Sequence, residues 1–450
     1  MTARFLSGAA ALALMAGGAW AQDLPYAPGE GDFNWDSYEA FAEAHDFGGE
    51  QLTIFGPWLA GEGAAFEKLV AYFNEAANVD GRYTGSDSLE QQIVIDAEAG
   101  SAPNLTSFPQ PGLAANMAER GFLTPLAEGT GDWVRENYAA GQSWVDLGTY
   151  EGEDGQEDLY GFFFNVNVKS LVWYIPENFE DAGYEIPETM EELKALTEQI
   201  VADGETPWCI GLGSGGATGW PATDWVEDLM LRTQPPEIYD EWVSNDMPFD
   251  DPRVIAAIDE FGWFARNDAH VAGGSSVVAS TDFRDSPKGL FDVPPQCYMH
   301  RQASFIPAYF PEGTVLGEDA DFFYFPAYEG KDLGVPVLGA GTLMAITNPS
   351  EAASAFMDFL KTPFAHEFMM SQDGFLTPHL GADPANYAND TQRGQGEILT
   401  NATTFRFDGS DLMPGGVGAG SFWTGMVDYV GGKSAEDVAA EIQASWDALK

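Results

Sequence analysis

The feature that most constrains the fold is an alternation of apolar strand-like and amphipathic helical segments after residue 50. Residues 51–55 form a short apolar run typical of a buried strand. Residues 63–76 carry apolar side chains at the spacing of one helix face, and residues 104–108 form a second short apolar run. Strand, helix and strand in this order predict parallel β-α-β units, and therefore a doubly wound α/β sheet.

Local signals predict where several helices begin. Ser88 with Gln91, and Thr189 with Glu192, have the spacing of a capping box, in which two side chains satisfy the free backbone groups at a helix start. Ser350 is expected to cap a helix that stops before Pro363, and residues 435–449 are expected to form the last amphipathic helix.

Residues 1–21 have the pattern of a signal peptide. Arg4 supplies the positive start, a short apolar stretch follows, and Ala19-Trp20-Ala21 fits the small-x-small cleavage rule. The apolar stretch is too short to span a bilayer. The sequence therefore predicts export, to a bacterial periplasm, of a protein with no lipid anchor.

The net charge argues against some classes of binding partner. The 450 residues contain 19 Lys and Arg against 71 Asp and Glu, a formal charge of −52, while aromatic residues make up 13% of the chain. A disordered acidic protein carries few aromatics, so we expect folded domains. A surface this negative repels phosphate backbones and anionic lipid, which argues against nucleic-acid or membrane-surface binding. Neutral or cationic small ligands remain the natural partners.

Cysteine and histidine are scarce. Cys209 and Cys297 lie in the exported part, where an even pair is expected to form a disulfide. The five histidines form no ligand-like pair, so no metal or other cofactor is predicted.

Two other motifs resemble ligand-binding patterns but match them only in part. Gly211-x-Gly213-x-x-Gly216 matches the dinucleotide fingerprint, but Pro221 is expected to interrupt the helix that should follow. The acidic segment 151–158 lacks EF-hand spacing, and its Asp154-Gly155 favours a solvated hairpin over a calcium site.

Four tryptophans lie within four residues of a glycine or a proline in the expected strand-to-helix loops: Trp58, Trp220, Trp225 and Trp423. Open α/β sheets bind ligands in the crevice at the carboxyl ends of their strands. A pyranose offers an apolar face that packs on indole and a rim of hydroxyls that needs donors and acceptors. For any one tryptophan, packing in the core is the competing interpretation.

Segments spread over nearly the whole mature chain resemble the extracellular solute-binding proteins of bacterial ABC importers. They are 51–58 with 61–63, 160–174, 187–193 and 339–346. Segments 219–225, 299–302, 405–408 and 420–423 resemble the α-glucoside-binding branch of that family. The resemblance implies a periplasmic-binding-protein-like α/β fold of two doubly wound lobes joined by three hinge crossings. The first lobe would comprise residues 22–158 plus 338–372, and the second 159–337 plus 373–450.

The resemblance also implies a ligand site without catalytic residues. Glu62 and Asp87 would hold sugar hydroxyls, with Gln110 as a further hydrogen-bonding candidate. Trp220 and Trp423 would be aromatic platforms, followed by Trp58 and Phe163, whereas Phe305 stands where relatives often carry Trp. Gly341 would offer backbone groups, and Arg406 would pair with hydroxyls or with a carboxylate on closure.

These observations predict a monomeric binding protein that captures an α-glucoside of the maltose, trehalose or sucrose type. It would deliver the sugar to an ABC permease and ATPase in the inner membrane. One alternative keeps the fold but changes the solute to a sulfonated or glycerol-linked sugar, or to a cationic compound. The other is a secreted glycoside hydrolase, which also needs aromatic residues and carboxylates.

Overall fold

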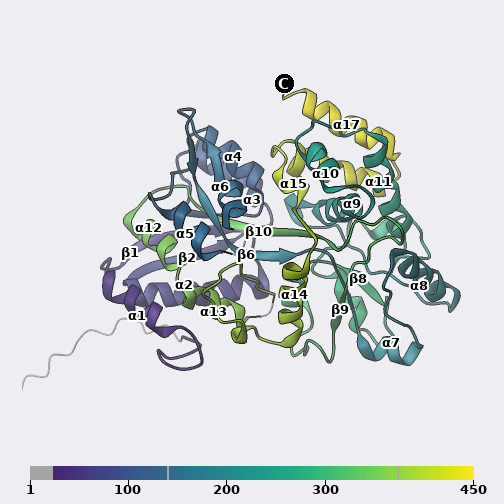
Figure 1. Cartoon of the computed structure of the whole chain (residues 1–450), viewed down its shortest axis with the longest axis horizontal. Coiled ribbons are helices and arrows are strands. Elements are labelled where there is room, and N and C mark those ends of the chain that lie inside the picture. Colours follow the sequence, from purple (N-terminus) through teal and green to yellow (C-terminus); the bar gives the residue numbers. More distant parts are fainter. Residues whose placement is uncertain (1–23, 139–140, 373, 450) are drawn as a thin grey trace, which may run out of the picture.

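The computed structural model describes residues 24–138, 141–372 and 374–449, so the expected signal peptide at 1–21 lies outside the described residues. The chain forms two lobes side by side, with β6 and β10 running through the region between them (Figure 1). No helix in the described ranges is both long and apolar enough to cross a membrane.

The first lobe is built on a six-stranded sheet of order β11-β10-β3-β1-β2, with β6 paired to β10. Its strands are β1 (Glu50–Gly56), β2 (Val79–Gly85), β3 (Leu105–Phe108), β6 (Gly161–Val168), β10 (Pro336–Ile346) and β11 (Thr404–Phe407). Pairing of β1 is parallel to both β2 and β3, which confirms the predicted β-α-β units. Strand β10 is antiparallel to β3 and β6, and β11 returns parallel to β10.

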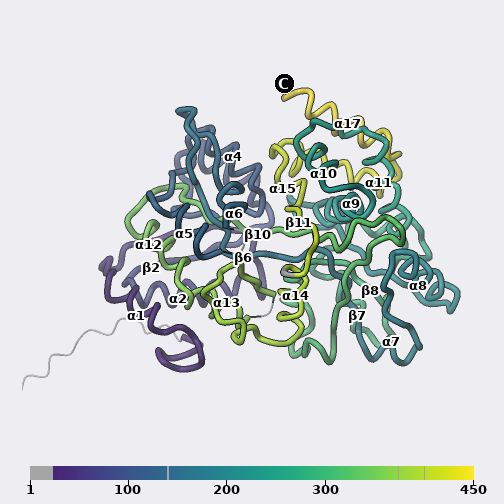
Figure 2. The backbone as a smooth tube through the Cα atoms, viewed as in Figure 1, coloured from purple at the N-terminus to yellow at the C-terminus, as the bar shows by residue number. Residues whose placement is uncertain are grey.

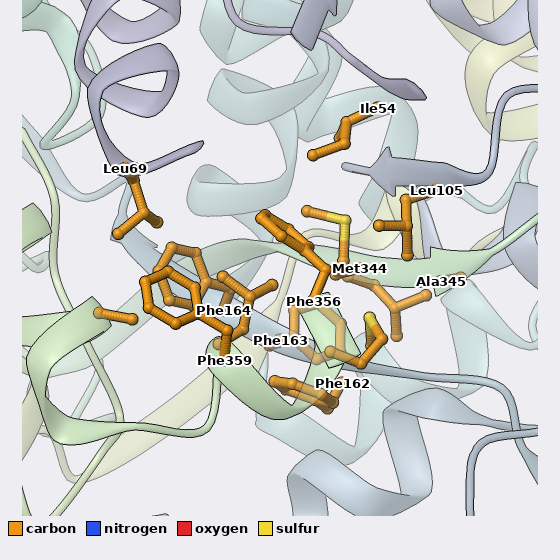
Figure 3. Packing of buried hydrophobic residues seen from close by; sticks show 14 of the residues in the cluster. Ile54, Leu69, Leu105, Phe162, Phe163, Phe164, Met344, Ala345, Phe356 and Phe359 are labelled. Carbon is orange, nitrogen blue, oxygen red and sulfur yellow. The ribbon is translucent and has the colours of Figure 1, made fainter. Parts of the chain in front are cut away.

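Helices surround this sheet. They are α1 (Trp35–Ala44), α2 (Ala60–Ala77), α3 (Leu89–Glu98), α4 (Pro111–Glu119), α5 (Thr130–Asn137), α6 (Gly141–Gly148), α12 (Glu351–Phe359) and α13 (Pro363–Met370). Figure 3 shows the core between them, where Ile54 and Leu105 of the parallel strands lie with phenylalanines of β6 and α12. Every residue of β6 and β10 is buried, because both strands run through the middle of the molecule.

The second lobe has a smaller sheet. Its strands are β7 (Leu171–Tyr174), β8 (Met299–Arg301) and β9 (Asp321–Tyr324), in the order β8-β7-β9, and both pairings are antiparallel. Its helices are α7 (Pro176–Ala182), α8 (Met190–Ala202), α9 (Trp220–Thr233), α10 (Pro236–Val243), α11 (Pro252–Ala265), α15 (Gly409–Leu412), α16 (Trp423–Val430) and α17 (Ala435–Asp447). The second lobe is therefore dominated by helices, and its named strands pair antiparallel, whereas a doubly wound sheet is mostly parallel.

The chain passes between the lobes three times. The tube in Figure 2 follows these passages, and the buried clusters of the two lobes change over between Val166 and Val172, between Leu338 and Ala340, and between Phe407 and Met413. Helix α14 (Asp390–Asn401) precedes the third passage and contacts both β6 of the first sheet and β9 of the second. The lobe ranges derived from the sequence stay a prediction. In the structure β6, expected in the second lobe, pairs with β10 of the first sheet.

Local signals were predicted with mixed success. The Thr189–Glu192 capping box is present, Ser350 caps α12, and β4 (Thr149–Glu151) and β5 (Glu157–Leu159) form the expected hairpin. The Ser88–Gln91 box was wrong. Ser88 is at the N-cap of α3, but its side chain makes no capping bond, and Gln91 Nε2 donates instead to the Gly216 carbonyl at 3.4 Å.

The expectation for Pro221 was also wrong. Pro221 lies in the first turn of α9, and the helix continues without interruption to Thr233. A proline is tolerated there because the first backbone N–H groups of a helix have no partner within the helix.

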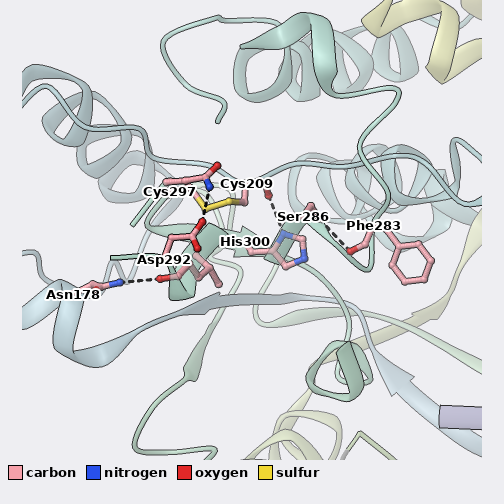
Figure 4. Close-up of a disulfide and its surroundings, with 9 residues drawn as sticks. Asn178, Cys209, Phe283, Ser286, Asp292, Cys297 and His300 are labelled. Carbon is pink, nitrogen blue, oxygen red and sulfur yellow. Dashed lines mark hydrogen bonds between the residues drawn. A yellow bond between two sulfur atoms is a disulfide. The ribbon is translucent and has the colours of Figure 1, made fainter. Parts of the chain in front are cut away.

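The predicted disulfide between Cys209 and Cys297 is present, with Cα atoms 5.5 Å apart (Figure 4). Beside it, His300 Nδ1 donates to the Cys209 carbonyl at 2.8 Å. Burial lowers the pKa of the His300 imidazole to about 4, so the ring is neutral. The bond joins the chain leading into β8 to the segment that runs on through the glycine motif to α9.

Candidate functional site

A cavity of about 130 Å³ lies where the two lobes meet. This volume is roughly tenfold the 10–15 Å³ needed for one water. The first lobe contributes the loops that follow β1, β2 and β3 and the first turns of α2 and α3, namely Pro57, Trp58, Glu62, Ser86, Asp87, Glu90, Pro109 and Gln110. These loops leave the carboxyl ends of neighbouring parallel strands, which is where open α/β sheets bind ligands.

The second lobe and the crossing segments form the remaining walls. The second lobe contributes Ser214, Ala217, Trp220, Phe283, Arg284, Phe305, Tyr309 and Trp423. The crossing segments contribute Asn167, Lys169, Ala340, Gly341, Thr342, Asp408 and Asp411. A ligand in the cavity would therefore touch both lobes and the chain segments between them.

The lobes already contact each other around the cavity. The Gly216 N–H donates to the Asp87 carbonyl at 3.1 Å, and Tyr309 donates to Glu62 Oε2 at 2.5 Å. Gly215, which has φ +57°, approaches Asp87 so closely that an added Cβ would lie 2.4 Å from the Asp87 carboxylate. The glycine motif thus forms the part of the second lobe that lies against the first.

Two glutamates on the first-lobe wall are buried and have raised pKa values. Burial raises the pKa of Glu62 to about 7, and the hydrogen bond from Tyr309 and the charge of Arg284 offset only part of this. Burial likewise raises the pKa of Glu90 to about 7, with a further rise from Asp87 and a partial offset from hydrogen bonds. Both side chains can therefore act as donor or acceptor near neutral pH.

The aromatic walls come from both lobes. The Trp220 ring packs edge-on against Phe283 at 4.9 Å and lies 6.0 Å from Phe305. Trp423 begins α16 and is almost fully buried. The Tyr83 hydroxyl bonds both the N–H and the carbonyl of Trp58, at 2.8 and 3.0 Å, and this holds the Trp58 backbone in place.

Seven of the residues singled out from the sequence line the cavity: Trp58, Glu62, Asp87, Gln110, Trp220, Gly341 and Trp423. Three others lie elsewhere. Phe163 belongs to the first-lobe core, with its ring 5.1 Å from Trp144 and 5.3 Å from Phe407. Arg406 forms a two-point ion pair with Asp240 on the surface, at 2.6 and 2.8 Å. Trp225 packs in the second-lobe core.

Sequence reasoning missed much of the cavity wall. Glu90, Asn167, Lys169, Arg284, Tyr309, Asp408 and Asp411 were not predicted, and Phe305 does line the cavity. One signal was present for Lys169, which is the lone charged residue within the apolar segment 159–175. Nothing in the sequence places Arg284 or Tyr309 opposite Glu62, because they are more than two hundred residues away.

Five polar atoms on the walls have no hydrogen-bond partner within the described ranges. They are Glu90 Oε2, Gln110 Oε1, Asn167 Oδ1, Arg284 Nε and Trp423 Nε1. A buried polar atom without a partner costs about 1–3 kcal/mol. Each of these atoms is itself covered by neighbouring protein atoms, so a ligand in the cavity reaches it only if side chains move. The lining as a whole still offers both donors and acceptors, which suits a ligand rich in hydroxyl groups, since each hydroxyl both donates and accepts.

A cluster of three buried carboxylates lies beside the cavity. Ligand atoms of Asp224, Glu227 and Asp408 come within 4.8 Å of one another, a spacing that could hold a metal ion. The Lys169 ammonium, however, donates to both Asp224 and Asp408 and already places a positive charge among them.

The fold and the cavity define a two-lobed solute-binding protein. The family model described as "Bacterial extracellular solute-binding protein" matches residues 56–365. The chain therefore belongs to the bacterial extracellular solute-binding proteins.

Two relatives match most of the chain. The "Alpha-glucosides-binding periplasmic protein AglE" of Rhizobium meliloti is 63% identical over 458 residues, which cover 100% of both chains. The "Osmoprotective compounds-binding protein GgtB" of Synechocystis sp. is 42% identical over 398 residues, 88% of this chain and 92% of the relative.

Solved structures share the fold at low identity. The bacterial solute receptor AcbH, described as having an exclusive preference for b-D-galactopyranose, has a TM-score of 0.75 at 20% identity, covering 89% of this chain and 100% of AcbH. Maltose-bound MalE3 of T. maritima has a TM-score of 0.67 at 14% identity, covering 89% of this chain and 100% of that chain.

Proposed function

We propose that this protein is the periplasmic solute-binding component of an ABC sugar importer. Its ligand is a neutral α-glucoside of the maltose, trehalose or sucrose type, and its partners are a permease and an ATPase of the inner membrane. It works as a monomer, needs no cofactor, and changes no bond in the sugar.

The combination of polar and aromatic residues that line the cavity carries this proposal. The polar side chains come from both lobes and from the crossing segments, and Trp220 and Trp423 line the same cavity. A pyranose brings hydroxyls for the polar atoms and an apolar face for a ring, so it meets both requirements at once. AglE, the 63% identical relative, is named for binding α-glucosides.

Binding favours the closed form. A ligand shifts a two-state equilibrium only by its differential affinity for the two states. A sugar in this cavity gains contacts from both lobes only when they are closed, so its binding energy opposes opening. The permease would then recognise the closed form.

The test is a ligand panel followed by calorimetry. Maltose, trehalose and sucrose are expected to raise the melting temperature of the purified mature protein, since a ligand that binds only the folded state stabilises it. Glucose 6-phosphate and glucuronate serve as charged controls. Absence of a shift with any neutral α-glucoside, together with a clear shift for another solute, would reject the proposal.

A glycerol-linked sugar is the second candidate. GgtB, which is 42% identical over most of the chain, is named for osmoprotective compounds. Glucosylglycerol therefore belongs in the panel, and competition with trehalose in calorimetry ranks the two. A sulfonated sugar is less well supported, because five carboxylates line the cavity against the two cations Lys169 and Arg284.

The hydrolase alternative is tested directly. The named relatives are binding proteins. Incubation with p-nitrophenyl α-glucoside and with each disaccharide is expected to release no product, and sustained turnover by the pure protein would favour the enzyme.

A further inference from the structure

The three passages of the chain between the lobes meet at one buried point. The Lys169 N–H, just after β6, donates to the Leu338 carbonyl in β10 at 2.8 Å. The Leu338 N–H donates to Ser170 Oγ at 2.9 Å, and Ser170 Oγ donates to Asp228 of α9, also at 2.9 Å. The first two passages are thus tied together and to a helix of the second lobe.

The Lys169 side chain connects the third passage to the other two. Its ammonium donates to Asp224 Oδ1 of α9 at 2.8 Å and to Asp408, which directly follows β11. Lys169 is only 5% exposed. Burial alone would lower the pKa of the ammonium, but the carboxylates of Asp224 and Asp408 outweigh it and hold the pKa well above its ordinary value. The side chain is therefore a fixed positive charge.

Lys169 also lines the cavity, and its Nζ lies 5.3 Å from the centroid of the ring of Trp220, another lining residue. Trp220 begins α9, the helix that also carries Asp224. An ammonium has three donors, and the two carboxylates use two of them, which leaves the third for a ligand.

We propose that Lys169 couples occupancy of the cavity to the hinge. It is a positioning residue that holds the Trp220 ring, α9 and the crossing segments in the closed arrangement, and a ligand hydroxyl completes its coordination. The inference rests on the proposed function for the identity of the ligand. Its physical basis is that a buried ion pair is strongly destabilised when one partner is withdrawn, so lobe rotation that separates Lys169 from Asp408 is opposed.

The test compares two variants with a matched control. Lys169→Met keeps the aliphatic stem and removes the charge. Lys169→Met/Asp408→Asn also removes one of the two carboxylates left without a partner, the one on the third passage, and so lowers the cost to folding. The control is Lys194→Met, because Lys194 likewise pairs with a carboxylate, Glu260, and lies 4.9 Å from the Trp263 ring centroid, away from the cavity.

The readouts are the melting temperature, the sugar Kd by calorimetry, and the radius of gyration by small-angle scattering with and without saturating sugar. The double variant is expected to fold, to bind at least thirtyfold more weakly, and to lose the sugar-induced decrease in radius of gyration. Lys194→Met is expected to keep the wild-type Kd and the sugar-induced decrease in radius of gyration. A merely structural role would lower only the melting temperature. A folded double variant that binds within threefold of the wild type and still closes would overturn the proposal.

A second experiment uses the wild-type protein and needs no substitution in the hinge. In the wild-type protein labelled with 15N-lysine, the ammonium resonance of Lys169 is expected to be protected from exchange and to shift on addition of sugar. An unchanged resonance at saturation would also overturn the proposal.

The sugar assignment can fail while the hinge coupling holds, and the experiment separates the two outcomes. If the wild type binds none of the neutral glucosides, the sugar assignment fails. Hinge coupling is then judged from the ligand-free proteins, where the double variant is expected to show a larger radius of gyration than the wild type and Lys194→Met. Equal values would reject the coupling itself.

Discussion

The hydroxyl of Tyr309 donates a hydrogen bond to Glu62 Oε2 at 2.5 Å, across the cavity between the lobes. Tyr309 ends a short 3-10 helix of the second lobe (Ile306–Tyr309), and Glu62 lies in the first turn of α2 in the first lobe. Both residues also line the cavity. The contact therefore joins closure of the lobes to the side chain expected to hold a sugar hydroxyl.

Glu62→Gln is expected to weaken sugar binding by about 1.5–3 kcal/mol, the range for a hydrogen bond to a charged group. The side chain keeps its shape but loses the ability to ionise. Isothermal calorimetry with the best ligand of the panel measures the change. A difference of only a few tenths of a kcal/mol would remove Glu62 from the site.

Gly215→Ala is expected to weaken binding at least tenfold, about 1.4 kcal/mol. The new Cβ would lie 2.4 Å from the Asp87 carboxylate and so oppose closure. Gly183→Ala is the control, because Gly183 also has positive φ, at +71°, but an added Cβ there meets nothing within 4 Å. Both variants carry the strain of the left-handed region, about 1–2 kcal/mol. Equal loss of binding in the two would show that strain, and not closure, is responsible.

Trp220→Ala is expected to abolish measurable sugar binding while the protein still folds. The ring lies on the cavity wall and is only partly buried, so its removal takes away a platform without opening the core. Trp263→Ala, which removes a partly buried indole of α11 outside the cavity, is the control. Near-unchanged affinity of Trp220→Ala in calorimetry would exclude Trp220 from the site.

Acid is expected to destabilise the fold through His300. Burial lowers its pKa from 6.5 to about 4 in the folded chain. Between these values the unfolded chain binds the proton and the folded chain does not, so the free energy of unfolding falls as pH drops from 6.5 to 4. The loss is on the order of 3 kcal/mol for a shift of this size.

His300→Asn tests this. Its amide N–H₂ can replace the Nδ1 donor to the Cys209 carbonyl without titrating. Urea unfolding at pH 7 and pH 4.5 is expected to show a smaller pH dependence in the variant than in the wild type. An identical pH dependence would assign the acid sensitivity to other groups, among them His366, whose pKa is also well below its ordinary value because of burial.

Local patterns predicted the elements better than the contacts between them. The apolar runs that became β1 and β3, and the Thr189–Glu192 box, depend on neighbours a few residues away, and all were confirmed. The Ser88–Gln91 box was wrong because the Gln91 side chain does not turn back to the helix start. Its Nε2 donates to the Gly216 carbonyl of the other lobe. Pro221 was misjudged because the exact start of α9 depends on how the preceding glycine loop is held.

The sequence by itself determined the alternation of strands and helices, the disulfide pair, and the placement of Trp58, Asp87 and Gln110 in loops at strand ends. These follow from hydrophobic periodicity and turn-forming residues, which act over short distances. Only the tertiary structure decided that Lys169 meets Asp408, 239 residues away, and that Arg406 instead pairs with Asp240 on the surface. Which opposite charges find each other depends on what the fold buries together, because a charge is costly to bury unless it is paired, whereas at the surface water can satisfy it.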